Sequence, residues 1–580
     1  MWVLESQRAK DGTPAGKSAH LAIERRDSIA RTVGFGLVII GALVLYVLSL
    51  HLYQIGSGVD DGYYIVTAQS LAAGKGYVLG TIVGSPPMLR LPPGFPLLLS
   101  VVARIAPHSL AAFRIPSLLL TLGAFPLWFT LLRQRVGYAW ATLAMVAVAV
   151  NQFVLGSATS AMSEAMTFFL IPLLIVLVEA ALDQRNLKSR GRSLGLTLAI
   201  ILTLVALHFA RSVMIVFVAS TFVYLVLNRQ VRRALVIAIL AGVPFVAWMG
   251  YSLNLLPTVV TGANSVSTTG VTSTNSSVAP VFMASSYGSA IVGGNEQQLA
   301  ATFSGKLTAF LNRRWSLVAI FLPDSLGLDF VPFGAPRLTT RLLLLLHLDW
   351  LPSIVTWSTG LVVVLGLIVG LVVRRRAGGE FAELATLFYF LGLSVWPYPS
   401  SRFFEPVVPM LYLGLILGVV AIVGRPQFGA RKQTLTRIAV AVALAVVFAA
   451  NFRNDVVQLR QPPRLNLPDL SVGSAWLADH APANAIVASD DAVLHSLYVR
   501  QDLWPIPSGH LTDDAYLAAL RQVHASYVLI APWLNNSRFD PHFSPATQYL
   551  QKVIAAHPDQ FQLVYSNTAD RVEIYRFQPR

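Results

Sequence analysis

The chain has 580 residues, of which 55% are hydrophobic and only 12% are charged, and its mean hydropathy is +0.61. A composition this apolar excludes an ordinary soluble domain. The formal net charge of +15 does not indicate nucleic-acid binding, because the Lys and Arg residues gather in short groups between apolar runs rather than on one folded domain. The chain has no cysteine, which excludes disulfides and thiolate metal sites.

Residues 1–31 are polar and mixed in charge, and we expect a loose cytoplasmic tail. The first apolar run is too long for the core of a signal peptide, so we interpret it as a retained membrane span. Further runs have the length of about 17–25 residues that crosses a bilayer as a helix. The predicted spans are 32–52, 109–132, 138–157, 161–181, 193–210, 211–227, 233–252, 353–373, 381–398, 403–423 and 436–452.

The basic residues between these spans indicate the orientation of the chain. If the N-terminus is cytoplasmic, every basic group falls on the cytoplasmic side, as the positive-inside rule requires. The first loop (53–108), a long loop (253–352) and residues 453–580 are then extracytoplasmic. The groups are Arg25/Arg26/Arg31, Arg133/Arg135, Arg185/Lys188/Arg190/Arg192, Arg229/Arg232/Arg233, Arg374/Arg375/Arg376 and Arg425/Arg431/Lys432/Arg437.

The first loop carries Asp60-Asp61-Gly62-Tyr63-Tyr64 shortly after the first span. Apolar residues from Ile65 to Ala72 recur at helical spacing, which predicts a short amphipathic helix on the membrane surface. A second apolar patch, Leu97–Ile105, is expected to re-enter the membrane or to lie along its interface. Two adjacent acids where a span leaves the bilayer indicate chemistry at the lipid boundary.

The long loop begins with a Ser-, Thr-, Gly- and Asn-rich stretch at 258–298, which predicts a flexible segment. Residues 299–315 look helical and carry Lys306, Arg313 and Arg314. Such a loop is either a lid over an active site or a plain connector, and the sequence leaves both interpretations open.

The last 110 residues or so change to the pattern of a small α/β domain. This segment contains no phosphate-binding glycine loop, metal-ligand cluster or nucleophile elbow, and we expect it to recognise a partner or an acceptor. The predicted strands are Ile486–Ser489, Tyr527–Ala531, Phe561–Tyr565 and Val572–Phe577, and the predicted helices are Ala515–Val523 and Ala546–Ala556.

Charged and polar residues stand at the outer ends of several spans, where each alone is commonly solvated. As a set they predict one site, with a carboxylate as general base and arginines that bind a phosphate. A site that faces away from ATP and nucleotide sugars requires a donor already activated on a lipid, such as a polyprenyl-phosphate sugar. The set comprises Asp60, Asp61, Glu164, His208, Arg211, Arg402 and Glu405.

These residues resemble the GT-C glycosyltransferases that use polyprenyl-phosphate sugars, a group that includes protein O-mannosyltransferases and the lipid A aminoarabinose transferase. The matching pieces are Asp60-Asp61 with Leu71…Gly74-x-Gly76-Tyr77, Pro92-Pro93-Gly94-Phe95-Pro96-Leu97, Ser163-Glu164 and Arg402-Phe403-Phe404-Glu405-Pro406-Val407-Val408-Pro409. The resemblance covers nearly the whole chain, and its most specific part is the first loop.

The resemblance implies an inverting displacement with Asp60 as catalytic base. The usual pair is Asp-Glu, whereas this chain has Asp-Asp, so the choice between Asp60 and Asp61 stays open. Arg402 and Arg211, with His208, are the implied ligands of the donor phosphate. Glu164, Tyr63 and Glu405 are the implied residues that orient the acceptor or the base. No cofactor is implied besides the lipid-linked donor, and no ligand set demands a metal.

The prediction is therefore an α-helical polytopic membrane protein of GT-C-like fold, with a catalytic domain at 32–452 and an extracytoplasmic α/β domain at 453–580. We expect a glycosyltransferase in the bacterial inner membrane that acts on an extracytoplasmic glycan, lipid or protein. A transporter or flippase is the main alternative, although transporters commonly show paired repeats and polar groups at the bilayer midplane. A non-catalytic assembly protein is the third. The sequence identifies neither the sugar nor the acceptor.

Overall fold

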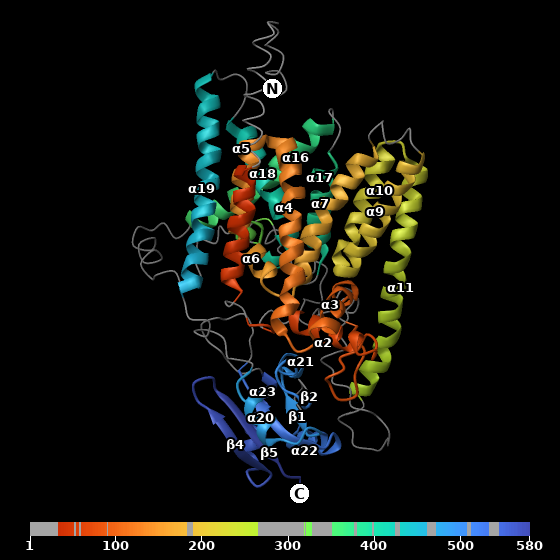
Figure 1. The fold of residues 1–580 in the computed structure, drawn as a ribbon, viewed down its shortest axis with the longest axis vertical. Helices are drawn as coiled ribbons and strands as arrows, with labels where there is room; N and C mark the ends of the chain where they lie inside the picture. Colours follow the sequence, from red (N-terminus) through yellow and green to blue (C-terminus); the bar gives the residue numbers. More distant parts are fainter. Residues whose placement is uncertain are drawn as a thin grey trace, which may run out of the picture.

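A computed structural model shows a helical bundle with a small α/β domain at one end and two short helices between them (Figure 1). The short helices are α2 (Asp60–Ala72) and α3 (Gly94–Ile105). The structure describes residues 33–50, 54–56, 60–89, 91–182, 190–264, 318, 321–326, 351–375, 380–396, 400–423, 430–460, 471–506, 512–532 and 545–579.

Each predicted span corresponds to an apolar helix or to a pair of consecutive helices. Among the described residues, seven helices are long and apolar enough to cross a membrane, and the pair α5–α6, bent by 62°, makes an eighth. The remaining apolar spans are shorter: Val33–Ser49, Ser212–Leu227 and Phe381–Ser394. The elements are η2 (Leu110–Arg114) with α4 (Ile115–Val136), α5 (Tyr138–Ala149) with α6 (Gln152–Ala158), α7 (Ser163–Ala181), α9 (Arg190–Ala210), η3 (Ser212–Ile215) with α10 (Val216–Leu227), α11 (Val231–Asn264), α14 (Leu322–Ser325), α16 (Leu351–Arg375), α17 (Phe381–Val395), η7 (Ser401–Val407) with α18 (Val408–Val423), and α19 (Ala430–Arg460).

Two helices continue beyond the predicted spans. Helix α11 reaches Asn264, so the beginning of the predicted flexible segment at 258–298 is helical, and α19 reaches Arg460. Hydropathy detects only the part of a helix that is apolar enough for the bilayer, and it does not detect a polar extension. The rest of that segment and the basic group at 306–314 lie outside the described residues.

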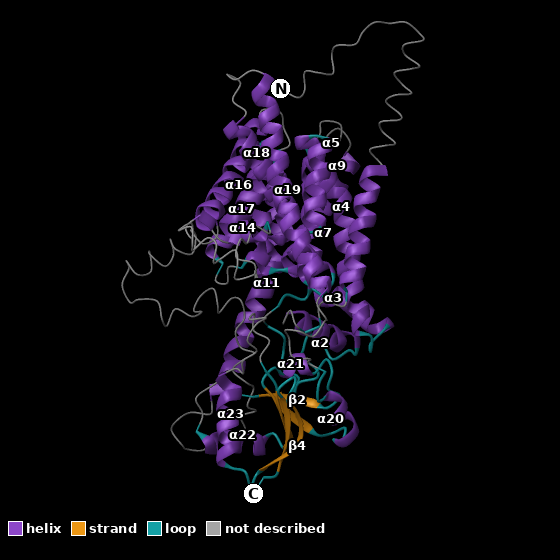
Figure 2. Ribbon diagram, turned by 90° about the vertical axis from the view of Figure 1, so that its left-hand side faces the viewer, coloured by secondary structure: helices purple, strands orange, loops and turns teal. Residues whose placement is uncertain are grey.

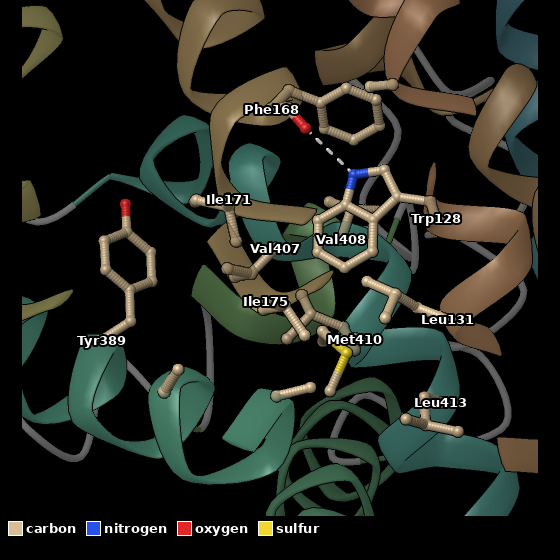
Figure 3. Close-up of a cluster of buried hydrophobic side chains, with 14 of the residues drawn as sticks. Trp128, Leu131, Phe168, Ile171, Ile175, Tyr389, Val407, Val408, Met410 and Leu413 are labelled. Carbon is tan, nitrogen blue, oxygen red and sulfur yellow. Dashed lines mark hydrogen bonds between the residues drawn. The ribbon is translucent and has the colours of Figure 1, made fainter. Parts of the chain in front are cut away.

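The core of the bundle positions the segment that carries Arg402. In this core the Trp128 indole N–H donates to the Phe168 carbonyl at 3.0 Å (Figure 3). Helices α16 and α18 approach so closely that a Cβ on Gly366 would lie 1.8 Å from the Gly414 carbonyl oxygen. Small residues allow this kind of backbone approach between membrane helices. Because α18 follows directly from η7, this packing also fixes η7.

The α/β domain has one five-stranded sheet in the order β2-β1-β3-β5-β4. Strand β1 is parallel to β2 and β3, whereas β5 is antiparallel to β3 and β4. The four predicted strands and both predicted helices are present, whereas strand β2 and the short helices α20 and α21 were not predicted. The elements are α20 (Ser474–His480), β1 (Ile486–Ser489), α21 (Ala492–His495), β2 (Asp502–Pro505), α22 (Asp513–Gln522), β3 (Ala525–Ile530), α23 (Pro545–Ala556), β4 (Phe561–Asn567) and β5 (Val572–Phe577).

Each face of this sheet is covered by different elements (Figure 2). Tyr527 and Leu529 of β3 point into one hydrophobic cluster, whereas Val528 and Ile530 point into another that contains residues of α22 and α23. The first cluster also contains Ile65 and Phe95 from the first loop. The α/β domain and the first loop therefore share one hydrophobic core.

Helix α2 is not an amphipathic helix on the membrane surface, and that prediction is wrong. Ile65 and Ala68 are fully buried, and so are the polar residues of its first turn. The loop that follows α2 also extends the sheet: Ile82 forms a parallel bridge with Leu503 of β2, and the Val83 N–H donates to the Leu503 carbonyl at 2.9 Å. Helix α3, in contrast, exposes apolar side chains, with Ile105 80% accessible, as expected for an interfacial segment.

Candidate active site

Charged side chains from distant parts of the sequence meet at the end of the bundle nearest the α/β domain. Asp60 begins α2, Glu164 lies in the first turn of α7, Arg211 stands between α9 and η3, and Arg402 lies at the start of η7. Each side chain thus comes from the beginning of an element or from a junction between elements. Such positions can leave the regular helix and direct a charge towards a common centre.

These four side chains form a chain of alternating charges. Arg402 makes an ion pair with Asp60, and its Nε lies 3.6 Å from Glu164 Oε1. Arg211 makes a second ion pair with the same Glu164 oxygen. The Glu164 and Arg211 side chains are 2% and 7% exposed, whereas that of Arg402 is 32% exposed. Arg402 is therefore the more accessible of the two cations to an arriving anion.

An aromatic ring holds the two arginines next to each other. The guanidinium carbons of Arg211 and Arg402 lie 4.5 Å and 5.6 Å from the centre of the Phe403 ring. The Phe403 carbonyl accepts a hydrogen bond from the Tyr389 hydroxyl at 2.6 Å. Cation–π contacts favour both positive charges at this ring, so two guanidinium groups are presented close together in one buried place. This arrangement suits a phosphate.

Asp61 has different surroundings from Asp60. Its Oδ2 accepts from the Gly56 backbone N–H at 2.8 Å, and its Oδ1 accepts from the Gly62 N–H at 3.0 Å. Burial raises the pKa of Asp61 to about 6, against the two backbone hydrogen bonds, which lower it. Asp61 therefore organises the turn before α2 and the start of that helix, while Asp60 contacts Arg402.

A small pocket with a cavity volume of about 10 Å³ adjoins these charges. Tyr64, Trp396 and Arg211 contribute its aromatic and charged lining. The Tyr64 hydroxyl shares a hydrogen bond of 2.7 Å with Ser163 Oγ at the start of α7. At Gly94 a Cβ would lie 2.7 Å from the Phe209 backbone, so only glycine lets α3 approach the end of α9 at this wall.

Three other predicted site residues belong to the described part of the chain. Glu405 accepts a hydrogen bond from Ser157 Oγ and lies within electrostatic reach of Glu164 and both arginines. The His208 ring packs against Phe245 of α11, with 5.6 Å between the ring centroids. Tyr63 belongs to the core shared with the α/β domain. Phosphate binding by His208 and substrate orientation by Tyr63 stay predictions, and the predicted lid residues Lys306, Arg313 and Arg314 lie outside the described residues.

The sequence did not identify four residues that lie at this site: Tyr64, Ser163, Trp396 and Phe403. Tyr64, Ser163 and Phe403 each lie within a motif that was noticed for its charge, and Ser163 and Phe403 immediately adjoin a charged residue of the site. Within the described part of the chain, no group of three or more His, Asp and Glu residues is arranged to hold a metal ion. Whether a metal takes part thus stays open.

The bundle, the interposed first loop and the terminal α/β domain define a polytopic membrane protein of the GT-C fold. No protein-family model matches the sequence, and a comparison with curated protein sequences gives no significant match. The fold is similar to that of ArnT from Cupriavidus metallidurans bound to undecaprenyl phosphate, with a TM-score of 0.53, 13% identity, and coverage of 93% of this chain and 97% of that chain.

The fold is also similar to the Archaeoglobus fulgidus oligosaccharyltransferase. The complex of that protein with Zn and sulfate gives a TM-score of 0.50 and 12% identity over 93% of this chain and 73% of that one. The form tethered to an acceptor peptide gives 0.51 and 12% over 94% and 74%. At these identities the similarity establishes the fold, which is the one predicted from the resemblance along the sequence.

Proposed function

We propose that this protein is an integral-membrane glycosyltransferase that transfers a sugar from a polyprenyl-phosphate-linked donor to an extracytoplasmic acceptor. The observation that carries the proposal is the buried group in which Asp60 contacts Arg402 and both arginines contact Glu164. It combines a carboxylate able to take a proton with two cations able to hold a phosphate. The structure of ArnT with undecaprenyl phosphate, which shares the fold, supports the choice of a lipid-linked donor.

Arg402 and Arg211 bind the donor phosphate in this proposal. Charge-assisted hydrogen bonds from guanidinium groups suit the planar arrangement of phosphate oxygens. Arg211 also lines the cavity beside the charged group, together with Tyr64 and Trp396. The sugar of the donor then lies near aromatic side chains, while its polyprenyl chain extends into the membrane along the apolar surface of the bundle.

The reaction is a single displacement at the anomeric carbon. Asp60 removes the proton from an acceptor hydroxyl or amine, and the acceptor atom forms a bond to the anomeric carbon. The bond from that carbon to the phosphate oxygen breaks, and polyprenyl phosphate leaves with the electron pair. The arginines stabilise its negative charge. Attack opposite to the leaving group inverts the configuration of the sugar.

Asp60 is better suited to be the base than Asp61. Both carboxylate oxygens of Asp61 accept backbone N–H groups, at 2.8 Å and 3.0 Å, and these hydrogen bonds stabilise its ionised form and so weaken it as a base. Asp60 is instead paired with a side chain that can change partner when the phosphate arrives. Asp61 then acts by holding the turn in which Asp60 begins α2.

We place the protein in the bacterial inner membrane with the α/β domain outside the cytoplasm. The six basic groups between the spans support this orientation through the positive-inside rule. The charged site lies at the end of the bundle near the α/β domain, so the orientation opens it to the extracytoplasmic side. A donor already linked to a lipid is available there.

The test is a comparison of cell-envelope glycans, glycolipids and glycoproteins by mass spectrometry in a deletion strain carrying wild type, Asp60→Asn or Arg402→Ala. Asp514→Asn and Arg104→Ala remove exposed charges of the same kind and serve as matched controls. We expect one sugar modification to be absent from the deletion strain. Wild type and the two control variants should restore it, whereas Asp60→Asn and Arg402→Ala should not. Unchanged envelope sugars in the deletion strain contradict the proposed function.

A further inference from the structure

The α/β domain reaches the turn that holds the acid pair. The hydroxyl of Tyr498, which follows α21, donates to the Ile55 carbonyl at 2.6 Å. The next backbone N–H, that of Gly56, donates to Asp61 Oδ2 at 2.8 Å. The Ile55 carbonyl and the Gly56 N–H belong to one peptide unit, which is planar. The bond at its carbonyl therefore fixes the direction in which its N–H points.

The backbone of Gly56 makes this turn dependent on its contacts. Gly56 has φ = 96°, in the left-handed region that favours glycine, so the backbone at this position is intrinsically free to move. Both groups of the Ile55–Gly56 peptide are engaged, one by the α/β domain and the other by Asp61. The hydrogen bond from Tyr498 removes a rotation that glycine would otherwise allow.

A second contact places the α/β domain against the same turn of α2. A Cβ on Gly62 would lie 2.5 Å from Leu494 Cδ2 of α21, so these elements touch through a glycine. Helix α21 is itself tied to the end of β1, because Ser489 Oγ and His495 Nδ1 share a buried hydrogen bond of 2.6 Å. Burial lowers the pKa of His495 to about 4, so this bond joins two neutral groups at physiological pH.

We propose that Tyr498 is a positioning residue for the acid pair, acting through the Ile55–Gly56 peptide on Asp61 and thereby on the start of α2. This inference rests on the proposed function, and it gives the α/β domain a role inside the active site. Tyr498 acts without touching the substrate. The domain thus supports the catalytic machinery, in addition to any acceptor recognition expected from the sequence.

The charge on Asp61 gives the proposal a measurable signature. The Gly56 N–H stabilises the ionised carboxylate and so lowers the pKa of Asp61. The other charges that act on Asp61 are Asp60, which raises its pKa, and Arg114 of η2, which lowers it. Without the Tyr498 hydroxyl the peptide can turn away, and the pKa of Asp61 then rises further above about 6.

The experiment compares the pH dependence of sugar transfer by wild type, Tyr498→Phe and Tyr575→Phe. Tyr575 is the matched control, because its hydroxyl donates to Glu573 within β5 at 2.7 Å. In Tyr498→Phe we expect the acidic limb of the kcat profile to move up by about one pH unit, so that kcat falls by about tenfold at pH 5 and by about twofold at pH 7. KM for the donor stays unchanged, since the arginines keep their places. A Tyr498→Phe profile superimposable on those of wild type and Tyr575→Phe overturns the inference.

Hydrogen exchange separates this inference from the proposed function. If wild type transfers no sugar at any pH, the proposed function has failed, but the backbone amides of Gly56 and Gly62 still report on the turn. We expect faster exchange at these two amides in Tyr498→Phe than in Tyr575→Phe, with exchange at the amides of the sheet unchanged. Equal protection in the two variants overturns the positioning role.

Discussion

Asp60 and Arg402 are 342 positions apart in the sequence, and their side chains form an ion pair in the buried charged group at one end of the bundle. In the proposed reaction these are the base and a ligand of the donor phosphate. The two functions exclude each other while the pair is closed, because Arg402 neutralises the carboxylate that must accept a proton. A phosphate that takes the guanidinium releases Asp60, so donor binding prepares the base.

This exchange predicts opposite effects of the two substitutions on binding of undecaprenyl phosphate to the purified protein. Arg402→Ala removes a phosphate ligand and is expected to weaken binding by about tenfold or more. Asp60→Asn removes a competitor for the same guanidinium, so binding should be equal to or tighter than that of wild type. A titration in detergent measures both. Equal weakening in the two variants contradicts the exchange.

The ion pair between Arg211 and Glu164 is expected to stabilise the fold as well as the site. Arg211→Ala leaves the buried Glu164 carboxylate with the 3.6 Å contact to Arg402 Nε and a 3.4 Å hydrogen bond from Ser163 Oγ, and a broken buried pair costs about 3–5 kcal/mol. The thermal midpoint in detergent should fall clearly, whereas Arg104→Ala, at an exposed position, should leave it unchanged. Adding Glu164→Gln to Arg211→Ala should recover part of the loss. No drop in the midpoint for Arg211→Ala means that the pair is not formed.

Acidic pH is expected to change activity and stability in opposite directions through Asp61. Its pKa is raised from 3.8 to about 6 by burial, so between these two values the folded protein binds a proton that the unfolded chain does not. The contribution of Asp61 to the free energy of unfolding is therefore greatest at low pH, and it is lost as the pH rises through about 6. The rate of sugar transfer should decrease when the pH is below about 6, because the proposed reaction uses the ionised and hydrogen-bonded Asp61. Asp61→Asn should abolish this acidic limb, and a limb that survives in Asp61→Asn belongs to another group.

The contact between α2 and α21 predicts a compensating pair of substitutions. Gly62→Ala introduces a Cβ 2.5 Å from Leu494 Cδ2, so α21 must shift and the start of α2 is disturbed. We expect transfer to fall by about tenfold or more in Gly62→Ala, following the strong effect of small displacements on reacting groups. The double variant Gly62→Ala/Leu494→Ala should recover most of the lost transfer activity. If Leu494→Ala deepens the defect, the steric explanation is wrong.

The charged part of the site could be predicted because Glu164, Arg211 and Arg402 stand out in apolar surroundings, where a charge is costly. Their common location followed from the orientation of the spans. The role of His208 could not be inferred from its closeness to Arg211 in the sequence. Helix α9 ends before Arg211, whose backbone is extended (φ −152°, ψ 129°), so helical spacing does not relate the two side chains.

The burial of α2 could not be predicted, because its cover comes from α21, more than four hundred residues later in the chain. Periodicity indicates which residues of a helix are apolar, but it does not show what packs on the other side. Strand β2 was missed for a similar reason. Asp502–Pro505 is short and ends in proline, and its place in the sheet comes from pairing with β1 and with Ile82 of the first loop.

The most direct test of the central claim is steady-state sugar transfer from a polyprenyl-phosphate donor by wild type, Asp60→Asn and Arg402→Ala in detergent. A base acts on the chemical step, so Asp60→Asn should lower kcat by about 100-fold or more with little change in KM for the donor. Arg402→Ala should raise KM for the donor. Transfer by Asp60→Asn at the wild-type rate with saturating donor contradicts the account.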